Sequence, residues 1–398
     1  MLIGLVGKPS SGKSTLFNAS TLAGIPTAAY PFTTIEPNKG TGFVRVACAC
    51  KDFETHCNPR HGYCKKGTRF VPVELIDVAG LIPGAHEGKG LGNKFLNDLN
   101  QADVLIHVID CSGTTNEKGE PCQEYDPTDD VRFLETEIDQ WYLSILKKGW
   151  DKFARGVQNN RLEISAALAD QMSSFKVTER IVKQAINSLN LPKEKPLDWT
   201  SEQKTDLAVE LRKATKPMII ACNKIDLPSS KKNYEKLKTT FPNYTFIPCA
   251  ADFELALREA SEKGLIDYLP GNSDFTIVKP ESLNDKQKQA LEHIKEKVLK
   301  IWGSTGVQQV LDEAVFKFLK YIAIFPGGVK KLEDRDGNRL PDCFLLPPGT
   351  TAFNFANHIH TDLGKHFLFA MDVRTKMKIG KDHPLKNRDV IEIISAAK

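Results

Sequence analysis

The stretch GKPSSGKS at residues 7–14 constrains the fold of this chain most, because it matches the phosphate-binding pattern G-x-x-x-x-G-K-[ST] in full. It follows the apolar run LIGLV at residues 2–6, which predicts a buried strand, and it precedes a predicted helix over residues 15–19. In that setting the loop amides and the helix N-terminus direct positive dipoles at a phosphate. We expect Lys13 to reach the β- and γ-phosphates and Ser14 to bind Mg²⁺. The predicted nucleotide-binding residues of this loop are Gly7, Lys8, Pro9, Ser10, Ser11, Gly12, Lys13, Ser14 and Thr15.

A second predicted strand, residues 70–76, ends in a candidate metal carboxylate within Asp77-Val78-Ala79-Gly80. A carboxylate at the C-terminal end of a parallel strand lies at the ligand edge of an open α/β sheet, where it can hold Mg²⁺ through water. We expect the Gly80 amide to approach the γ-phosphate, and Thr34, in YPFTTIEP at residues 30–37, to sense it. The predicted magnesium ligands are Ser14, Thr34 and Asp77, and the candidate catalytic groups are Lys13, Thr34 and Gly80.

A third predicted strand, residues 217–222, leads into Asn223-Lys224-Ile225-Asp226, the residues that we expect to bind the base. The Asp226 carboxylate can accept hydrogen bonds from N1–H and the 2-amino group of guanine, whereas adenine offers neither donor. Selectivity built on such a buried polar group is on the order of 10⁴ or more. The Lys224 stem can lie on the base plane. The next predicted strand, residues 244–250, adds Cys249 and the Ala250 amide, which can contact guanine O6. We therefore predict GTP and GDP as ligands.

Composition excludes several classes of protein. A chain of 398 residues is expected to form two or three domains, and 41% apolar with 26% charged residues is typical of soluble globular proteins. The sequence has no 18-residue apolar run and no signal-peptide pattern after Met1, so we predict a cytoplasmic protein without a membrane span. The net charge of +4 is weak evidence for any partner, and we expect a monomer.

Four of the nine cysteines, Cys48, Cys50, Cys57 and Cys64, gather within a segment at residues 43–68. Four thiolates suit tetrahedral zinc, although C-x-C-x₆-C-x₆-C is not a standard zinc-finger spacing. Two disulfides, which occur inside hyperthermophile cells, and four unpaired thiols are the alternatives that the sequence leaves open.

The pattern of elements predicts three parts. Residues 1–270 form an α/β phosphate-loop domain, which contains the cysteine-rich segment and a helical insertion at about residues 126–216. Residues 271–320 form a helical connector, and residues 321–398 form a β-rich domain. Asp126 and Thr200 are predicted to cap insertion helices, and Thr350 is predicted to cap a helix that ends at Gly364. We interpret His358 and His360 as ordinary helix residues.

Residues 77–110, DVAGLIPGAHEGKGLGNKFLNDLNQADVLIHVID, resemble the second switch of the Obg-family GTPases, and YPFTTIEPN at residues 30–38 resembles the first switch. The likeness is to archaeal and eukaryotic relatives of the YchF branch and covers nearly the whole chain. Residues 345–372 resemble the TGS domain, a ubiquitin-like β-grasp module. The resemblance implies an α/β P-loop GTPase domain with a helical insertion and a C-terminal TGS domain.

Two residues depart from this family pattern. YchF proteins proper tend to carry Glu, which favours ATP, where this chain has Asp226, so Asp226 implies GTP here. Some relatives carry a potassium-binding Asn in the phosphate loop, where this chain has Ser10, so potassium activation does not carry over.

Leu81 stands where Ras-like proteins place the glutamine that orients the attacking water, and leucine cannot orient water. This implies slow hydrolysis, or catalysis from elsewhere. His86 and Glu87, in the glycine-rich loop at residues 84–90, are candidates for that role, and the alternative is that both are solvated loop residues. We predict a slow GTPase that acts as a molecular switch; the alternative is a GTP-binding scaffold or RNA-binding module with negligible hydrolysis.

Residues 374–388, RTKMKIGKDHPLKNR, contain six basic residues between two predicted strands. Such clusters release counterions when they bind a phosphate backbone. A solvated loop is the alternative, but the resemblance to TGS-containing GTPases that associate with translation implies a ribosome or RNA contact through the C-terminal domain.

Overall fold

The computed structural model of the chain describes residues 1–21, 39–78, 98–334 and 336–396. Thr34, Gly80, Leu81, His86 and Glu87 lie outside these residues, so the predictions made for them stay predictions. The chain divides into two compact bodies. The first body contains residues 1–14 and 76–249, and the second contains residues 15–75 and 250–398.

The first body is built on parallel strands in the order β1 (Leu2–Val6), β5 (Val104–Asp110), β6 (Met218–Asn223) and β7 (Phe246–Pro248). The carboxyl end of β4 (Thr68–Asp77) lies beside β1, because the Val78 amide donates to the Leu5 carbonyl over 3.0 Å. Every residue of β5 and β6 is buried, as is typical of central strands in a parallel sheet. Because these strands are parallel, the phosphate loop, Asp77 and Asn223 all follow carboxyl ends of strands at one edge of the sheet.

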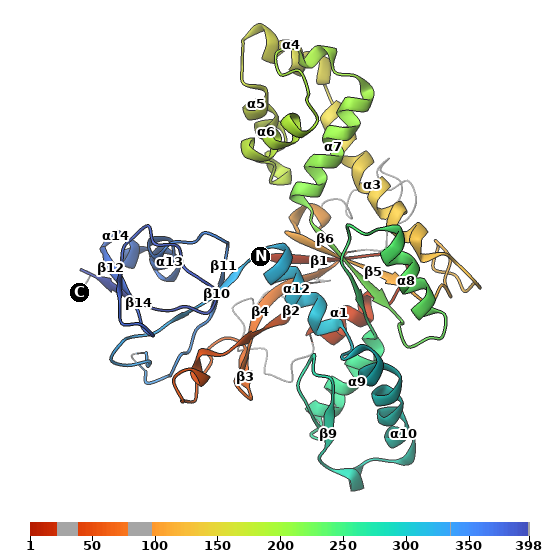
Figure 1. Cartoon of the computed structure of the whole chain (residues 1–398), viewed down its shortest axis with the longest axis vertical. Helices are drawn as coiled ribbons and strands as arrows, with labels where there is room; N and C mark the ends of the chain where they lie inside the picture. Colours follow the sequence, from red (N-terminus) through yellow and green to blue (C-terminus); the bar gives the residue numbers. More distant parts are fainter. Residues whose placement is uncertain (22–38, 79–97, 335, 397–398) are drawn as a thin grey trace. The chain divides into compact units, whose positions relative to one another are not determined.

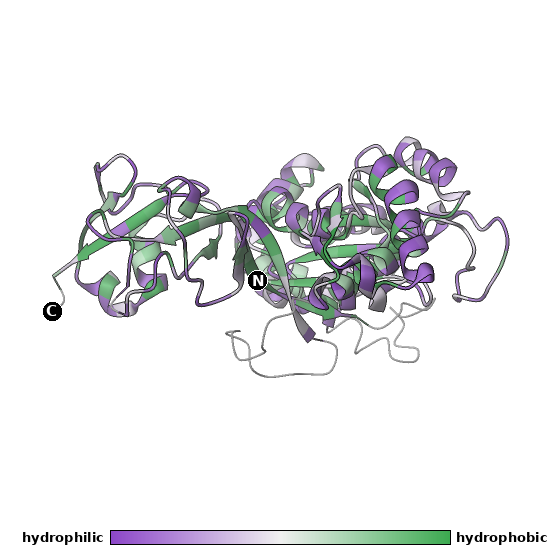
Figure 2. Ribbon diagram, turned by 90° about the horizontal axis from the view of Figure 1, so that it is seen from below, coloured by the Kyte–Doolittle hydropathy of each residue, from purple (hydrophilic) through white to green (hydrophobic). Residues whose placement is uncertain are grey.

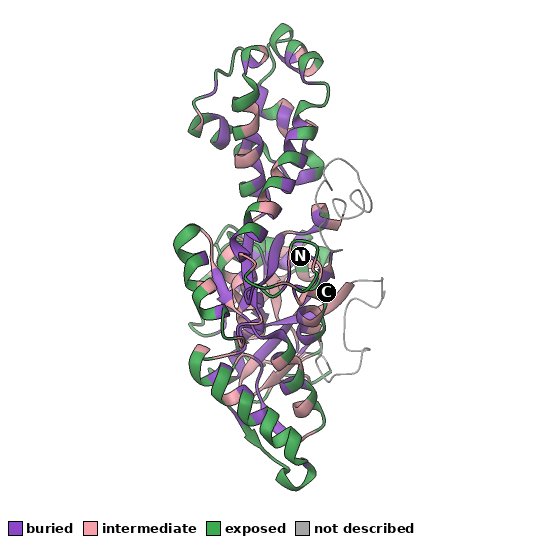
Figure 3. Ribbon diagram, turned by 90° about the vertical axis from the view of Figure 1, so that its right-hand side faces the viewer, coloured by how far each residue is buried: buried purple, intermediate pink, exposed green. Residues whose placement is uncertain are grey.

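Five helices lie between β5 and β6, in the part of the chain for which a helical insertion was predicted (Figure 1). They are α3 (Pro127–Lys147), α4 (Trp150–Asn159), α5 (Ile164–Gln171), α6 (Glu179–Ser188) and α7 (Ser201–Thr215). The predicted caps are confirmed: Asp126 accepts from the Thr128 amide, and Thr200 forms a capping box with Gln203. Each of these helices is buried along one side and exposed along the other, as Figure 3 shows. Their buried apolar side chains belong to one core that also includes Val6 of β1, Leu105 of β5 and Met218 of β6.

The second body begins with β2 (Lys39–Ala47), β3 (Tyr63–Lys65) and most of β4, in the order β2-β4-β3. Helix α1 (Lys13–Thr21) runs from the first body into the second, and α8 (Ser230–Thr240) follows β6 in the first. The second body resumes with α9 (Ala251–Glu262), the hairpin β8 (Ile266–Tyr268) and β9 (Phe275–Ile277), α10 (Asp285–Ile294), α11 (Lys300–Trp302) and α12 (Val307–Glu313). π-Helical turns follow α10 and α12 directly.

The C-terminal part forms a five-stranded sheet in the order β11-β10-β14-β12-β13. These strands are β10 (Ile322–Pro326), β11 (Phe344–Leu346), β12 (Phe367–Asp372), β13 (Lys378–Ile379) and β14 (Val390–Ser395), with helices α13 (Ala352–Ile359) and α14 (Thr361–Lys365) between β11 and β12. The parallel pair β10 and β14 at the centre of a mixed sheet is the arrangement of a β-grasp fold. These strands are rich in hydrophobic residues, which are green in Figure 2.

The predicted cap of α13 was wrong by one residue. Thr351, not Thr350, accepts from the Asn354 amide, and the Thr350 hydroxyl donates instead to the Pro347 carbonyl. His360 is not a mid-helix residue either, because its Nδ1 accepts from the Asp362 amide and caps α14. In the described part of the chain, no helix is both long and apolar enough to cross a membrane.

Candidate functional site

The phosphate loop has a backbone that only certain residues tolerate. Gly12 has φ +90°, and a Cβ atom there would lie 2.0 Å from Nδ2 of Asn223. That nitrogen donates to the Ser11 carbonyl over 3.0 Å, in a buried hydrogen bond between the end of β6 and the loop. A Cβ atom at Gly7 would lie 2.3 Å from the Val108 carbonyl oxygen on β5. The two glycines thus let the loop pack directly on the strand ends, and Asn223 holds it in shape.

Three residues predicted for magnesium and phosphate chemistry meet at the same edge. The Asp77 carboxylate accepts from Nζ of Lys13 over 2.7 Å and from the Ser14 hydroxyl over 2.9 Å. A hydroxyl and a carboxylate oxygen are ligands that Mg²⁺ prefers, so this donor set fits the ion. The Lys13 ammonium lies close enough to Asp77 to neutralise negative charge at this edge of the sheet.

The Lys8 side chain is buried and is bonded to the segment that follows β5. Its Nζ donates to the Thr115 carbonyl over 2.7 Å, lies 3.0 Å from Asp130 Oδ2 and lies 3.8 Å from the centre of the Tyr125 ring. Burial raises the pKa of Asp130 to about 6, although Lys8 opposes the shift. Because the Lys8 ammonium already has these partners, a phosphate contact of Lys8 would have to use its backbone amide. Its predicted role in nucleotide binding stays a prediction.

A histidine in the middle of β5 lies close to the same lysine. His107 is buried, and its Nδ1 has no hydrogen-bond partner among the described residues. Burial, with a smaller contribution from the charge of Lys8, lowers the pKa of His107 to about 3. The ring is therefore neutral at physiological pH.

Asp110, at the end of β5, bonds to Lys224 of the predicted base loop, and the sequence reasoning missed it. Its Oδ2 accepts from Nζ of Lys224 over 2.8 Å and from the Thr115 hydroxyl over 2.7 Å, and its Oδ1 accepts from the Ser112 amide over 3.0 Å. Burial alone would raise the pKa of Asp110, but its hydrogen bonds from Lys224, Ser112 and Thr115 hold it below its usual range. The charge pair fixes Lys224, which has φ +60°. A carboxylate at the carboxyl end of a buried strand was the signal that could have revealed it.

The base loop continues from Lys224 to the half-buried Asp226. The Ile225 amide donates to the Cys249 carbonyl over 3.1 Å, and the Cys249 amide donates to the Cys222 carbonyl over 2.8 Å. Cys249 is thereby joined to the base loop through backbone bonds.

Ala250 is the residue at which the second body resumes. Its amide already donates a hydrogen bond to the Thr305 carbonyl over 2.9 Å. The predicted contact of this amide with guanine O6 therefore competes with an existing hydrogen bond.

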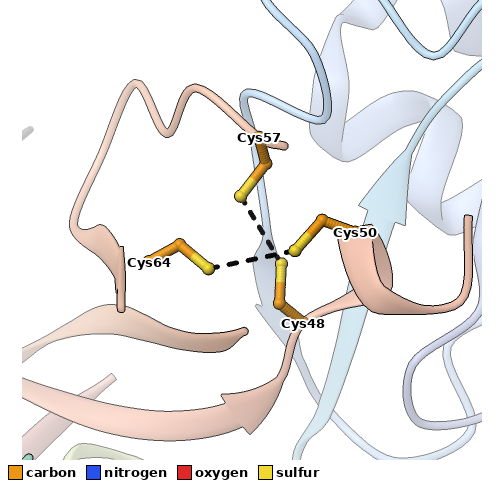
Figure 4. A group of neighbouring side chains, drawn as sticks. All are labelled: Cys48, Cys50, Cys57 and Cys64. Atoms are coloured by element: carbon orange, nitrogen blue, oxygen red, sulfur yellow. Dashed lines mark hydrogen bonds between the residues drawn. The ribbon is translucent and has the colours of Figure 1, made fainter. Parts of the chain in front are cut away.

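The four clustered cysteines point towards one another in the second body (Figure 4). Cys48 and Cys50 flank the start of a 3₁₀ turn at Ala49–Lys51, Cys57 lies in a loop, and Cys64 lies on β3. The Sγ atoms of Cys48 and Cys57 are 3.7 Å apart and those of Cys50 and Cys64 are 4.0 Å apart, with all four within 4.8 Å of one another. Bonds of about 2.3 Å to tetrahedral zinc place sulfur atoms about 3.8 Å apart, whereas a disulfide needs about 2.05 Å.

All nine cysteines are described and free, so the disulfide alternative does not match this structure. Hydrogen bonds from Cys57 and Cys64 lower the pKa of the Cys48 thiol. A group of four converging thiols, one of them poised to ionise, can hold a metal ion.

Two of the six basic residues in residues 374–388 are paired within the second body. Arg374 and Arg388 form ion pairs with Asp52 over 2.6 and 2.8 Å. The other four, Lys376, Lys378, Lys381 and Lys386, are exposed. Within residues 374–388, these lysines are the basic side chains that form no ion pair among the described residues, and they offer a cationic surface.

Three family descriptions match parts of the chain. "50S ribosome-binding GTPase" matches residues 2–137, "Obg-like GTPase YGR210-like, G4 motif-containing domain" matches residues 221–328, and "TGS domain" matches residues 327–395. Together they cover the phosphate loop, the base loop and the C-terminal sheet.

Similar proteins extend over the same length. An uncharacterized GTP-binding protein of Methanocaldococcus jannaschii is 47% identical over 100% of both chains. The ribosome-binding ATPase YchF of Escherichia coli O157:H7 is 27% identical over 98% of both chains. The crystal structure of a GTP binding protein from Pyrococcus horikoshii OT3 is 37% identical over 100% of both chains, with a TM-score of 0.78.

Proposed function

We propose that this chain, which belongs to the Obg-like GTPases of the YchF type, hydrolyses GTP slowly to GDP and acts as a molecular switch. The observation that carries the proposal is the meeting of Lys13, Ser14 and Asp77 at the edge of the sheet. Asn223 joins the phosphate loop to the base loop there, so both ends of a nucleotide have candidate partners. We also propose that the chain has the three parts predicted from its sequence and acts as a cytoplasmic monomer.

Ser14 and Asp77 are the described residues that would hold Mg²⁺, which neutralises developing charge on the phosphates. Lys13 would exchange its bond to Asp77 for one to the β- and γ-phosphates. Thr34 and Gly80 would complete the site, and His86 remains the candidate for orienting water.

Asp226 supports guanine as the base. The relative from Escherichia coli is named an ATPase, which makes ATP the competing ligand. Adenine offers no donor to the Asp226 carboxylate, whereas guanine offers two, and the 2.8 Å bond between Lys224 and Asp110 holds the preceding residues in place.

A ribosome or RNA contact is the proposed setting of the switch. The same relative is named ribosome-binding, and exposed lysines of the C-terminal domain form a cationic surface that suits a phosphate backbone. Under this proposal the contact uses Lys376, Lys378 and Lys381.

Single-turnover hydrolysis of GTP, with and without ribosomes, separates a GTPase from a GTP-binding scaffold. We expect slow magnesium-dependent hydrolysis that Asp77→Asn reduces by at least about tenfold. The Glu117→Gln variant, which changes an exposed carboxylate, is the matched control and should leave the rate unchanged. Absence of hydrolysis under every condition, with GTP still bound, would favour the scaffold.

We further propose that the four clustered cysteines hold one structural zinc ion. Their sulfur separations suit a tetrahedral site, and all four positions are filled by thiols, as in closed structural sites rather than catalytic ones. The zinc content of protein purified without added metal tests this, with about one ion per chain expected.

A further inference from the structure

The loop that carries the cysteines, residues 48–64, is bound to the C-terminal domain within the second body. We call it the cysteine loop. The Asn58 amide donates to the Arg339 carbonyl and the Arg60 amide donates to the Pro341 carbonyl, each over 2.9 Å. The Arg60 guanidinium adds ion pairs to Asp334 over 2.8 Å and to Asp342 over 3.1 Å. The cysteine loop is therefore joined to residues 336–342 by main-chain hydrogen bonds as well as by ion pairs.

The start of the cysteine loop has a second attachment. Asp52 accepts from both Arg374 and Arg388, and Nε of Arg388 donates to the Ala47 carbonyl over 2.9 Å. Two separate stretches of the C-terminal domain are thus tied to one short loop.

The cysteine loop has little of its own to hold this shape. Apart from the 3₁₀ turn it contains no regular structure before β3, and Lys51, Asp52, Glu54, His56 and Arg60 are exposed. The side chains that turn inwards are the thiols, with Cys48 and Cys50 buried. A four-way link among Cys48, Cys50, Cys57 and Cys64 would restrict the loop at its start, middle and end.

Arg69 connects the thiols with the C-terminal domain. It lies opposite Cys64 in the β3–β4 hairpin and is completely buried. Its guanidinium donates to the carbonyls of Leu340 and Pro341, the latter over 3.2 Å. No carboxylate lies within ion-pair distance of it among the described residues, and its Nε has no hydrogen-bond partner there.

A buried cation without a counter-charge is costly, and carbonyl oxygens compensate it only in part. One Zn²⁺ with four thiolates carries a net charge of 2−, which would supply the missing counter-charge beside Arg69. Arg69 pairs directly with Cys64 across the β3–β4 hairpin, which places the cation beside the cysteine cluster.

Resting on the proposed zinc site, we propose that this centre and Arg69 form a clamp that holds residues 336–346 of the C-terminal domain against the cysteine loop. The metal shapes the loop, and the loop and Arg69 together hold the Leu340 and Pro341 carbonyls. Loss of the metal, by chelation or by oxidation of the thiols to disulfides with an external oxidant, would loosen the domain without unfolding the first body.

The test is hydrogen exchange of the full-length protein before and after zinc is removed with a chelator. We expect amides in residues 336–346 to exchange at least about tenfold faster without zinc, and zinc added back to restore protection. The exchange rates of the amides in β5 and β6 should change less than about twofold, because these strands belong to the first body. The affinity for GDP should also change less than about twofold, because the phosphate loop belongs to the same body. Mass spectrometry under native conditions counts the zinc in each sample.

Variants divide the proposal into its two parts. Cys64→Ser should lose zinc and protection together, whereas Cys122→Ser, which changes a thiol outside the cluster, should keep both. Arg69→Leu should lose protection at residues 336–346 and bind zinc at least about tenfold more weakly, while Arg69→Lys should recover much of the zinc affinity. If Cys64→Ser fails to fold, removal of zinc from the parent protein with a chelator still tests whether the metal protects residues 336–346.

The outcomes are distinct. Protein without zinc under all conditions would overturn the zinc site and the clamp with it. Bound zinc whose removal leaves exchange at residues 336–346 unchanged would retain the zinc site and overturn the clamp. Unchanged zinc affinity in Arg69→Leu would remove Arg69 from the centre.

Discussion

Substitution of Gly12 by alanine should impair nucleotide binding through a neighbour rather than through a lost contact with the ligand. The added Cβ atom would lie 2.0 Å from Nδ2 of Asn223, well inside normal contact distance. Asn223 would have to turn away, which breaks its 3.0 Å hydrogen bond to the Ser11 carbonyl. The phosphate loop would thereby lose its attachment to β6.

The expected magnitude has two parts. Leaving a buried donor and acceptor unpaired costs about 1–3 kcal/mol. Holding a residue with a Cβ atom at φ +90° costs about 1–3 kcal/mol more. The sum of about 2–6 kcal/mol corresponds to GDP and GTP affinity about 30-fold to about 10⁴-fold weaker, if the loop must keep its native shape to bind.

Equilibrium titration with a fluorescent guanine nucleotide measures this loss. Gly156→Ala is the matched control, because it lies in α4 with nothing within 4 Å of the added atom, and it should bind as the parent does. Asn223→Ala combined with Gly12→Ala removes the clash but keeps the backbone strain, so the double variant should lose less affinity than the two single losses added together. Binding by Gly12→Ala within about threefold of the parent would refute the reasoning.

Three further predictions follow from the base loop, β5 and the C-terminal surface. Asp226→Asn should weaken GTP binding and shift preference towards xanthine nucleotides, whose 2-oxo group suits an amide; a parent protein that binds ATP as tightly as GTP would contradict it. His107 has its pKa lowered to about 3 by burial, so it contributes stability above pH 6.5 that is lost as pH falls towards 3, about 2 kcal/mol between pH 6.5 and 5. In urea unfolding followed by tryptophan fluorescence, His107→Gln should show a correspondingly smaller loss over that range, and an equal loss would exclude His107 as the cause. Neutralising Lys376, Lys378 and Lys381 together should reduce ribosome co-sedimentation and flatten its salt dependence while leaving GTP binding intact; unchanged co-sedimentation would move the contact elsewhere.

Site residues and helix caps whose interaction partners lie nearby in the chain could be predicted from the sequence. The phosphate loop, Asp77 and the base loop were recognised because a strand end and the polar residues after it are contiguous, and parallel strands bring such ends to one edge. The caps of Asp126 and Thr200 were predictable for the same reason, since a cap bonds within its own first turn. Thr350 and Thr351 show the limit of this reasoning, because two adjacent threonines present the same signal and only the turn geometry selects one.

The partners that are distant in the chain were decided by the tertiary structure alone. Asp110 and Lys224 are 114 residues apart, and no local pattern marks their pairing. The cysteines were visible in the sequence, but zinc, disulfides and free thiols differ in sulfur separations of a few tenths to two ångströms, which residue spacing does not specify. In the sequence, Arg69 is one charged residue immediately before the predicted strand at residues 70–76. It acquires its buried place between thiols and carbonyls 271 residues away only when the chain folds, because the environment of a charge is set by which distant atoms surround it.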